Sequence, residues 1–286
     1  MDTDSSAARI AVLIDADNVS SAYAEAILDE IASYGTPTIK RAYGDFSSSR
    51  LQKWTRELNA RAIRAMHQNA FTTGKNSTDL ALVIDAMDLL YANNVDAFAI
   101  VSSDSDFTGL VHRLREGGKT VYGLGRKNTV DALQNACDKF IQLEVLGAEG
   151  NGDDSNGDEV PETPETRDGE GGAAAETPPP PKINLQSALT KAVNATSDDH
   201  GWARLSGVGD HLARSHPSFD PRTFGHSKLS SLVREQPYLQ TRSEGAGMQV
   251  ALKGKASTGS GTARKAAAGK SPTKKATAKK TAAKKD

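Results

Sequence analysis

The chain has 286 residues, and its 35 Lys and Arg against 36 Asp and Glu leave a net charge of −1. This length allows one or two globular domains, and the single Cys137 excludes an internal disulfide or a zinc site built from cysteines. Since we find neither a secretory signal nor an apolar stretch of roughly 18 residues, we expect a cytoplasmic protein without membrane contact.

Short apolar segments alternate with amphipathic ones from Arg9 to Leu146. Apolar runs bounded by polar residues are typical of buried strands, and apolar residues three or four apart are typical of helices. This alternation predicts an α/β fold with a parallel, doubly wound sheet. The predicted strands are Arg9–Ile14, Thr36–Tyr43, Ala60–Met66, Asp96–Val101, Lys119–Leu124 and Phe140–Leu146. The predicted helices are Ser20–Tyr34, Ser47–Asn59, Thr78–Tyr91, Phe107–Glu116 and Thr129–Ala136.

The periodicity stops after Leu146. Residues 147–182 are acidic and close in Pro178–Pro181, which predicts a disordered linker. Periodicity returns in residues 183–252, where three helices followed by a hairpin predict a small winged-helix-like domain. The predicted elements are the helices Leu185–Ala195, Leu205–His216 and Ser227–Glu235 and the strands Tyr238–Arg242 and Met248–Leu252. Residues 253–286 are rich in Lys and Ala, which predicts a disordered basic tail that binds RNA and could also accept DNA.

Acidic residues stand at the ends of three predicted elements. Asp15 ends the first strand, Asp79 lies in the first turn of a helix, and Asp104 and Asp106 follow the strand Asp96–Val101. Open α/β folds place their ligands at the carboxyl ends of the strands. Mg²⁺ and Mn²⁺ prefer oxygen ligands, and a bound cation would offset the repulsion between gathered carboxylates. The pattern therefore predicts an acidic pocket that holds Mg²⁺ or Mn²⁺ and cuts RNA.

Each of these acids has a structural alternative. Asp and Asn side chains commonly accept hydrogen bonds from the first backbone N–H groups of a helix. Such capping would explain Asp17, Asn18, Asp79 or Asp106 taken singly, but it explains the whole set less well. Asp85 points away from Asp79 on the same helix, so it is expected to be a surface or linking residue.

Three stretches of the first domain, IDADNV, Lys75 to Asp79 and VSSDSDF, together resemble the NYN domain, a branch of the PIN-like nucleases, and its LabA-like group in particular. The resemblance covers about residues 9–146 and implies a Rossmann-like PIN/NYN sheet with a metal-dependent ribonuclease site. By position, it implies that the metal-binding and catalytic acids are Asp15, Asp79, Asp104 and Asp106, supported by Asn18 and Ser103. Asp17 replaces a small residue of many relatives, so it could reach the metal or cap the next helix.

The stretch DADNV also fits the Asp-x-Asp-x-(Thr/Val) pattern of haloacid-dehalogenase-like phosphatases. In that family Asp15 would be the covalent nucleophile and Asp17 the acid/base. The family also needs a Ser or Thr at a second strand end and a Lys before the last acids. Ser47–Ser49 and Lys75 are poor matches, and the insertion expected after the first strand is missing, so the phosphatase is the weaker hypothesis.

The stretches GWARL, PSFDPRTFG and KLSSL of the second domain resemble the OST-HTH domain, also called LOTUS, over about residues 183–252. This winged-helix-like family is associated with RNA. Trp202 and Leu212 are expected in its hydrophobic core. The candidate RNA contacts in the whole chain are Lys75, Arg126, Lys127, Arg222 and Lys228. For Arg222 a purely structural role is an equal alternative.

Together these features predict a metal-dependent endoribonuclease that a LOTUS domain and a basic tail bring to RNA. A non-catalytic RNA-binding adaptor with a vestigial acidic pocket is the second hypothesis. Related nucleases often pair, so a homodimer is one expected assembly.

Overall fold

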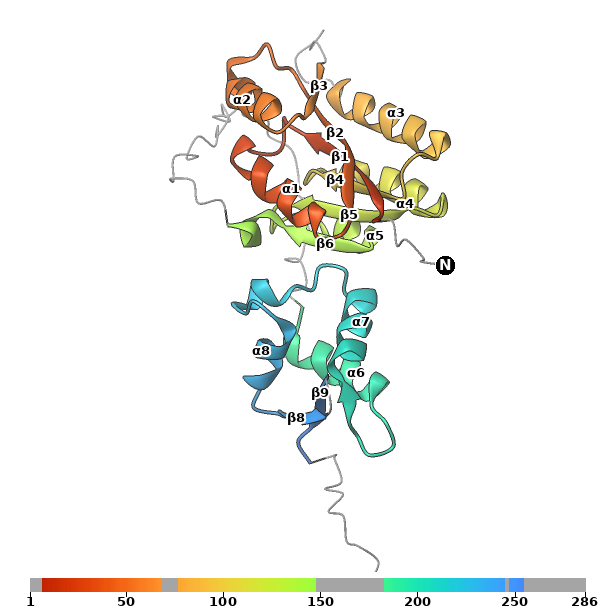
Figure 1. The fold of residues 1–286 in the computed structure, drawn as a ribbon, viewed down its shortest axis with the longest axis vertical. Coiled ribbons are helices and arrows are strands. Elements are labelled where there is room, and N and C mark those ends of the chain that lie inside the picture. Colours follow the sequence, from red (N-terminus) through yellow and green to blue (C-terminus); the bar gives the residue numbers. More distant parts are fainter. Residues whose placement is uncertain (1–6, 68–76, 148–182, 245–246, 255–286) are drawn as a thin grey trace, which may run out of the picture.

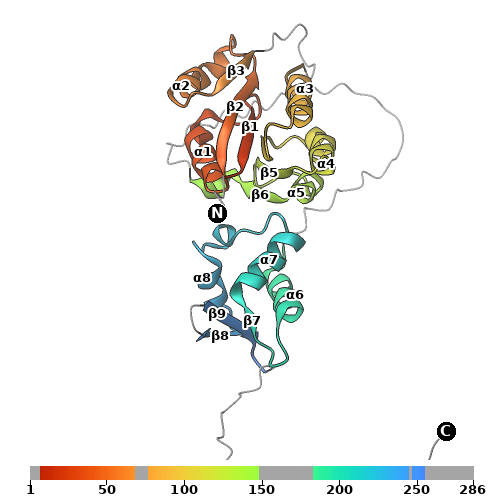
Figure 2. The same cartoon turned by 45° about the vertical axis from the view of Figure 1, so that its right-hand side comes forward.

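The computed structural model describes residues 7–67, 77–147, 183–244 and 247–254. They form an α/β domain and a smaller C-terminal domain, which lies beyond strand β6 in both ribbon views (Figures 1 and 2). No helix within these ranges is long and apolar enough to cross a membrane. Lys75 and most of the predicted linker and tail lie outside the described residues, so the expectations for them stay predictions.

The α/β domain contains a six-stranded sheet, all parallel, in the order β3-β2-β1-β4-β5-β6, which confirms the predicted fold class. The strands are β1 (Arg9–Asp15), β2 (Thr36–Gly44), β3 (Arg64–His67), β4 (Ala97–Val101), β5 (Thr120–Gly125) and β6 (Lys139–Gln142). The helices are α1 (Ala24–Ala32), α2 (Gln52–Ala60), α3 (Ser77–Ala92), α4 (Thr108–Glu116) and α5 (Asp131–Ala136). The 3-10 helices η1 (Ser21–Tyr23), η2 (Ser49–Leu51) and η3 (Ser105–Phe107) precede α1, α2 and α4, and η4 (Leu143–Leu146) follows β6.

Helices cover both faces of this sheet (Figure 2). Ile27 of α1 and Trp54 of α2 pack in one hydrophobic cluster, whereas Leu82 of α3 and Val111 of α4 pack in the other. The strands between them are apolar on both sides, and β1 is buried from Ile10 to its end. Burial on both faces is the usual condition of a parallel sheet, and it explains why the strands are continuous apolar runs in the sequence.

The chain changes direction across the sheet between β1 and β4. From β1 the chain proceeds to β2 and β3 on one side, whereas β4 is followed by β5 and β6 on the other. Loops that leave two such neighbouring strands diverge, and a crevice forms at the carboxyl edge between them. Asp15 ends β1 and Ser102 follows β4, so both residues stand at this crevice.

Several predicted boundaries differ from the structure, and two of the strands show why. The third strand begins at Arg64 rather than Ala60, because α2 continues to Ala60 and the chain then turns through Ala62 with a positive φ of 51°. The last strand ends at Gln142, where the chain continues as η4. In both places a local turn replaces part of an element that the apolar pattern alone predicts.

The C-terminal domain has three main helices and an antiparallel sheet in the order β7-β9-β8. Its elements are α6 (Leu185–Thr196), β7 (Ala203–Arg204), α7 (Leu205–Ser215), the 3-10 helix η5 (Pro221–Phe224), α8 (Leu229–Arg234), β8 (Leu239–Glu244) and β9 (Gly247–Leu252). Leu189, Val208, Leu212 and Val250 are buried in its core. The helices and hairpin agree with the predicted order, whereas the two-residue strand β7 was not predicted.

A charged cluster joins the two domains. The Arg222 guanidinium donates to both carboxylate oxygens of Glu30 in α1, at 2.8 and 2.9 Å, and pairs with Asp220 at 2.7 Å. The Tyr34 hydroxyl donates to Glu30 at 2.6 Å, and the Lys139 ammonium donates to that hydroxyl at 2.6 Å. We call these five residues the interdomain charge cluster. Outside the cluster, the edge strand β6 donates a backbone N–H to the Pro217 carbonyl at 2.9 Å.

Hydrogen bonds in this cluster outweigh the effect of burial on its acids. Burial alone would raise the pKa of Glu30, but hydrogen bonds from Arg222 and Tyr34 leave it lowered. The Asp220 pKa is likewise lowered, because its bonds to Arg222 exceed the effect of burial. For Lys139 burial dominates, and its pKa is lowered. The two acids are thus held in their charged forms by Arg222.

Candidate active site

Asp15 is a buried carboxylate at the end of β1, only 1% exposed. The Ser102 hydroxyl donates to its Oδ2 at 2.8 Å, and the Asn18 backbone N–H donates to its Oδ1 at 3.3 Å. Burial raises the pKa of Asp15 to about 6; the hydrogen bonds from Ser102 and Asn18 lower it, and the charges of Asp79 and Asp17 raise it. Asp15 is therefore held in a fixed orientation at a strong electrostatic cost.

Ser102 links the two central strands at this edge. While its hydroxyl donates to Asp15, it also accepts the backbone N–H of Asp104 at 3.1 Å. Ser102 was not among the residues predicted for this site. A signal was present, because Ser102 is the first residue after β4, and β4 pairs with β1 up to the contact between Val101 and Ile14.

Four further acids lie near this point: Asp79 in α3, Asp17 in the loop after β1, and Asp104 and Asp106 at the start of η3. Burial raises the pKa of Asp79, and the charges of Asp104, Asp17 and Asp106 raise it further, in that order. These acids are therefore close enough to repel one another. Asp104 also caps η3, because its Oδ1 accepts the Asp106 backbone N–H at 2.9 Å. Capping was the structural alternative for Asp106, but the cap of this helix is Asp104. Asp106 is exposed.

The acids are suitable ligands for a divalent cation by chemistry, but they do not converge on one point. Asp15, Asp79, Asp104 and Asp106 offer carboxylate oxygens, which Mg²⁺ and Mn²⁺ prefer. Within the described parts of the chain, no group of three or more His, Cys, Asp or Glu is close enough to hold a metal ion. The donor set therefore fits such an ion in ligand type, with the side chains still apart.

Asp17 forms an ion pair with Arg50. Its Oδ1 accepts from the Arg50 guanidinium at 2.6 Å, and its backbone carbonyl accepts from the same group at 3.2 Å. The pair lies in a pocket of about 320 Å³ next to the β1–η1 loop, which Lys53 and Arg126 also line. We call this the basic pocket. It places three cations beside the carboxyl edge of the sheet where Asp15, Asp79, Asp104 and Asp106 lie, which we call the acidic edge.

Of the other sequence-predicted residues, Ser103 and Lys127 follow strands at this edge, whereas Arg222 and Lys228 belong to the C-terminal domain. The Ser103 hydroxyl accepts the Arg126 backbone N–H at 2.8 Å, so it supports the β5–α5 loop. Lys127 has an exposed side chain, and its backbone N–H donates to Glu144. Arg222 belongs to the interdomain charge cluster, and Lys228 is exposed at the start of α8.

Asp85 of α3 has a linking role, as expected. Its carboxylate accepts hydrogen bonds from both Arg41 and Tyr43 of β2. Burial and the bonds to Asp85 raise the pKa of Tyr43 far above its ordinary value. This contact fastens α3, and with it Asp79, to the sheet.

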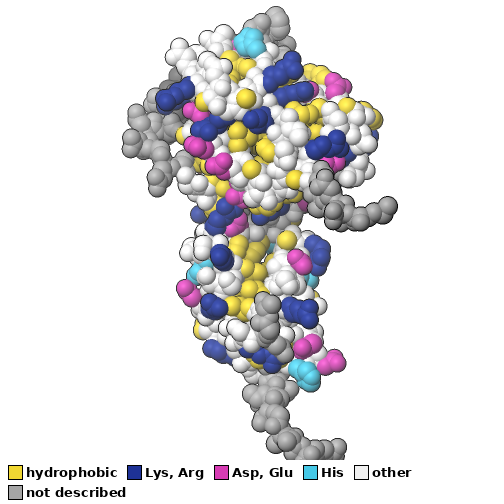
Figure 3. Space-filling model, viewed as in Figure 1, with side chains coloured by type: hydrophobic (Ala, Val, Ile, Leu, Met, Phe, Trp, Pro, Cys, Tyr) yellow, Lys and Arg dark blue, Asp and Glu magenta, His cyan; other side chains and the backbone are white. Residues whose placement is uncertain are grey.

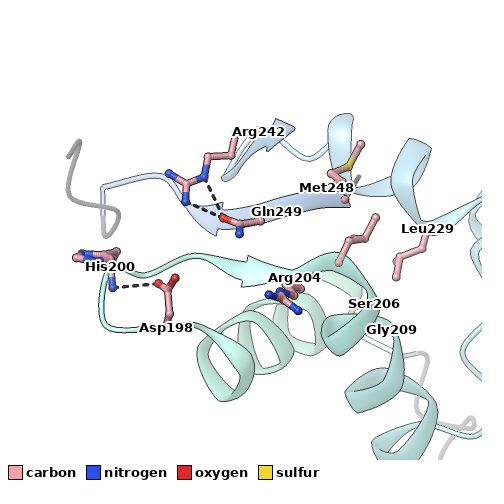
Figure 4. Close-up of a pocket in the computed structure, with 11 residues that line it drawn as sticks. Asp198, His200, Arg204, Ser206, Gly209, Leu229, Arg242, Met248 and Gln249 are labelled. Carbon is pink, nitrogen blue, oxygen red and sulfur yellow. Dashed lines mark hydrogen bonds between the residues drawn. The ribbon is translucent and has the colours of Figure 1, made fainter. Parts of the chain in front are cut away.

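The C-terminal domain contains a groove of about 1,110 Å³. Asp198, His200 and Arg204 approach it from the segment that leads into α7, and Arg242, Met248 and Gln249 approach it from the hairpin (Figure 4). This is the larger hollow, and it lies away from the acidic edge. We call it the hairpin groove.

Comparison with known proteins assigns both domains. Residues 9–144 match the NYN domain model, and residues 177–251 match the OST-HTH/LOTUS domain model. An uncharacterized protein of Methanocaldococcus jannaschii, MJ0482, is 29% identical over 143 residues, which are 47% of this chain and 55% of that protein. The chain therefore spans about half the length of this curated relative.

Several solved structures are similar to parts of this chain. A Vibrio parahaemolyticus protein of unknown function, VPA0982, is 21% identical, with a TM-score of 0.43 over 50% of this chain and 96% of its own. Residues 175–257 of a Chromobacterium violaceum protein are 40% identical, with a TM-score of 0.22 over 26% of this chain and 84% of that one. NYN domains belong to the PIN-like nucleases, and together with LOTUS domains they suggest a role with RNA. The chain thus combines an NYN domain of the PIN-like α/β fold with an OST-HTH/LOTUS domain.

Proposed function

We propose that this protein is a metal-dependent endoribonuclease that hydrolyses RNA phosphodiester bonds at the carboxyl edge of its NYN sheet. The observation that carries the proposal is the accumulation of uncompensated negative charge around Asp15. Its pKa is raised to about 6, and the pKa of Asp79 is raised by burial and by three neighbouring acids. Burial is the larger cause in both carboxyl groups, and the charges of neighbouring acids add to it. Acids that are buried together at such a cost favour a role for bound cations and substrate.

The residues of the site have distinct proposed roles. Asp15, Asp79, Asp104 and Asp106 would hold Mg²⁺ or Mn²⁺, which would supply Lewis-acid activation of the phosphodiester and of water. Ser102 and Asn18 orient the Asp15 carboxylate through the bonds described above. Ser102 also couples that carboxylate to the position of Asp104 through its backbone N–H.

The basic pocket would hold the RNA backbone beside these acids. Arg50, Lys53 and Arg126 offer positive charge within one hollow that adjoins Asp17. Phosphate contacts of this kind give affinity and register without reading the sequence of the bases. Asp17 holds the Arg50 guanidinium at this hollow through its carboxylate and its backbone carbonyl. The exposed cations Lys127 and Lys228, with Lys75, Arg222 and the basic tail, remain proposed further contacts.

The deciding experiment compares the full chain with Asp15→Asn on labelled single-stranded RNA with Mn²⁺, Mg²⁺ or EDTA. We expect cleavage with a metal, its loss in EDTA, and a decrease of about 10²–10³-fold in Asp15→Asn. Asp88→Asn is the matched control, because Asp88 is an exposed acid on α3, and it should cleave normally. Equal activity of the wild type and Asp15→Asn would reject this site.

A non-catalytic RNA-binding adaptor is the second candidate function. It is favoured by the separation of the carboxylates within the described part of the chain. The same experiment distinguishes it, because RNA binding without cleavage under either metal would support the adaptor. The NYN match leaves the phosphatase hypothesis without further support.

A further inference from the structure

We infer that the hairpin groove of the LOTUS domain binds the unpaired bases of single-stranded RNA. The groove is open, about 1,110 Å³ in volume, and lies between the start of α7 and the β8–β9 hairpin. Leu205, Leu229 and Met248 contribute apolar surface, while Arg204 and Arg242 contribute positive charge. The inference rests on RNA as the substrate of the proposed function, and it adds a place where that RNA is held.

Arg242 is the residue of the groove whose position best suits stacking against a base. Its guanidinium lies 4.2 Å from the centre of the Trp202 ring and donates to the Gln249 side chain at 3.0 and 2.8 Å. These contacts hold the guanidinium at the groove wall. Unpaired bases stack on arginine planes and on aromatic rings, which is how most sequence-tolerant single-strand recognition works.

The charge of the groove favours a polyanion. Asp198 is the acid among the lining residues, and it already accepts backbone N–H groups from Trp202 at 2.9 Å and from His200 at 3.0 Å. Those bonds lower the pKa of Asp198, the bond from Trp202 most strongly. Asp198 therefore stays charged and also interacts with Arg242, but the two arginines among the lining residues outnumber this one acid, so the lining keeps a net positive charge (Figure 4).

Apolar surface next to cations favours unpaired bases over duplex RNA. A duplex presents mainly phosphates and hydroxyls, whereas a single strand also exposes the faces of its bases. On this face of the molecule, hydrophobic side chains run down the middle of the LOTUS domain with Lys and Arg on both sides (Figure 3). An acidic peptide would also satisfy the charge, but it would not use a guanidinium already fixed for stacking.

The test measures binding of the full chain to a short labelled single-stranded RNA by fluorescence anisotropy in EDTA, so that cleavage does not interfere. We expect Arg204→Gln combined with Arg242→Gln to weaken binding by between about fivefold and a hundredfold. The matched control combines Arg214→Gln with Arg234→Gln, which removes the same charge from exposed positions of the same domain outside the groove. It should weaken binding less than threefold.

A second readout locates the RNA directly. Photo-crosslinking with 4-thiouridine RNA, followed by peptide mapping, should label the segments that contain Trp202 and Met248. Because Arg242 contacts Trp202, Arg204→Glu alone is tested in parallel: Arg204 is exposed, and the variant should keep the wild-type melting temperature.

Equal weakening by the two double variants, equal affinity for duplex RNA, or displacement by an acidic peptide would each overturn the inference. If RNA binding depends on the groove but no metal supports cleavage, the nuclease function is rejected and the inference about the groove stands. If the variant with Arg204→Gln and Arg242→Gln binds RNA as tightly as the wild type and still cleaves it, the groove is rejected and the proposed nuclease function stands.

Discussion

The acids of the acidic edge and those of the interdomain charge cluster have pKa values shifted in opposite directions. At the edge, burial and like charges raise the pKa values of Asp15 and Asp79, and for Asp15 they exceed the hydrogen bonds from Ser102 and Asn18. In the cluster, Glu30 and Asp220 have lowered pKa values, because Arg222 bonds to both. The contrast separates the two kinds of site: compensated charge fastens parts of a fold, while uncompensated charge is kept at a cost and is expected to serve ligands.

The largest expected effect comes from inverting the charge at the cluster. Arg222→Glu would leave Glu30 and Asp220 buried without their partner, which should cost about 3–5 kcal/mol of folding and docking free energy. Chemical unfolding should then show the LOTUS domain unfolding separately from the NYN domain. Arg234→Glu, an exposed change in the same domain, should cost little.

Combining Arg222→Glu with Glu30→Arg restores opposite charges across the contact and should recover part of the loss. A failure to recover would show that Arg222 acts within its own domain only. The pH dependence has a defined sign. Since the pKa values of Glu30 and Asp220 are lowered on folding, their stabilisation is present above the ordinary carboxyl pKa and is lost as pH falls through the folded values.

Removing charge at the acidic edge should have the opposite effect on stability. The pKa of Asp15 is about 6 in the folded chain against 3.8 ordinarily, so its ionisation costs up to about 3 kcal/mol at neutral pH. Below both values the cost disappears, because the carboxyl is protonated in both states. In EDTA, Asp15→Asn should therefore be more stable than the wild type at pH 7, and the gain should fall toward zero by about pH 4.

Thermal melting in EDTA across this pH range measures the gain. Asp88→Asn, at an exposed position, should show no such pH-dependent gain. A variant Asp15→Asn that is less stable at neutral pH would contradict the electrostatic account of the edge.

Ser102→Ala tests the bond that partly compensates Asp15. Its loss should raise the pKa of Asp15 further, because the Ser102 hydrogen bond lowers that pKa. Leaving a buried carboxylate with fewer bonds should also cost about 1–3 kcal/mol. Carboxyl ¹³C titration by NMR in EDTA measures the first effect, and unfolding measures the second. Ser105→Ala, an exposed change in the same loop, is the control; identical titration of Asp15 in both variants would remove Ser102 from the site.

The smallest expected effect on stability is that of Asp17→Asn. The Asp17 side chain is 28% exposed and that of Arg50 is 65% exposed, so the pair should contribute less than about 1 kcal/mol. Without that acid, the basic pocket becomes more positive, and RNA binding at low salt should tighten. Weaker binding by Asp17→Asn would instead indicate that Arg50 needs its carboxylate partner to reach RNA.

The sequence was sufficient for the parts of the fold that depend on periodicity. Apolar runs identify the strands because a parallel sheet is buried on both faces, and Asp15 stands out because it ends such a run. The acids from three elements could be grouped because the carboxyl ends of parallel strands share one edge. The raised pKa of Asp79 reflects how close these acids are to one another, but it does not test their function.

Contacts between distant side chains could not be predicted. Nothing in the local pattern pairs Arg50 with Asp17, or Arg222 with Glu30, which lie 192 residues apart. Trp202 illustrates the same limit, because its size predicts a core position. That prediction is wrong: Trp202 is only half-buried and carries the Arg242 guanidinium over its ring.

The backbone bond from Phe140 to Pro217 has a consequence for how the protein should be handled. Among the described residues β6 pairs with β5 alone, so its outer side presents backbone groups that could pair with a strand of another chain. In the full chain the LOTUS domain covers this side and accepts one of its N–H groups. A fragment that ends near Gly147 would expose this edge. We expect such a fragment to aggregate or to pair edge to edge, so its oligomeric state should not be attributed to the intact protein.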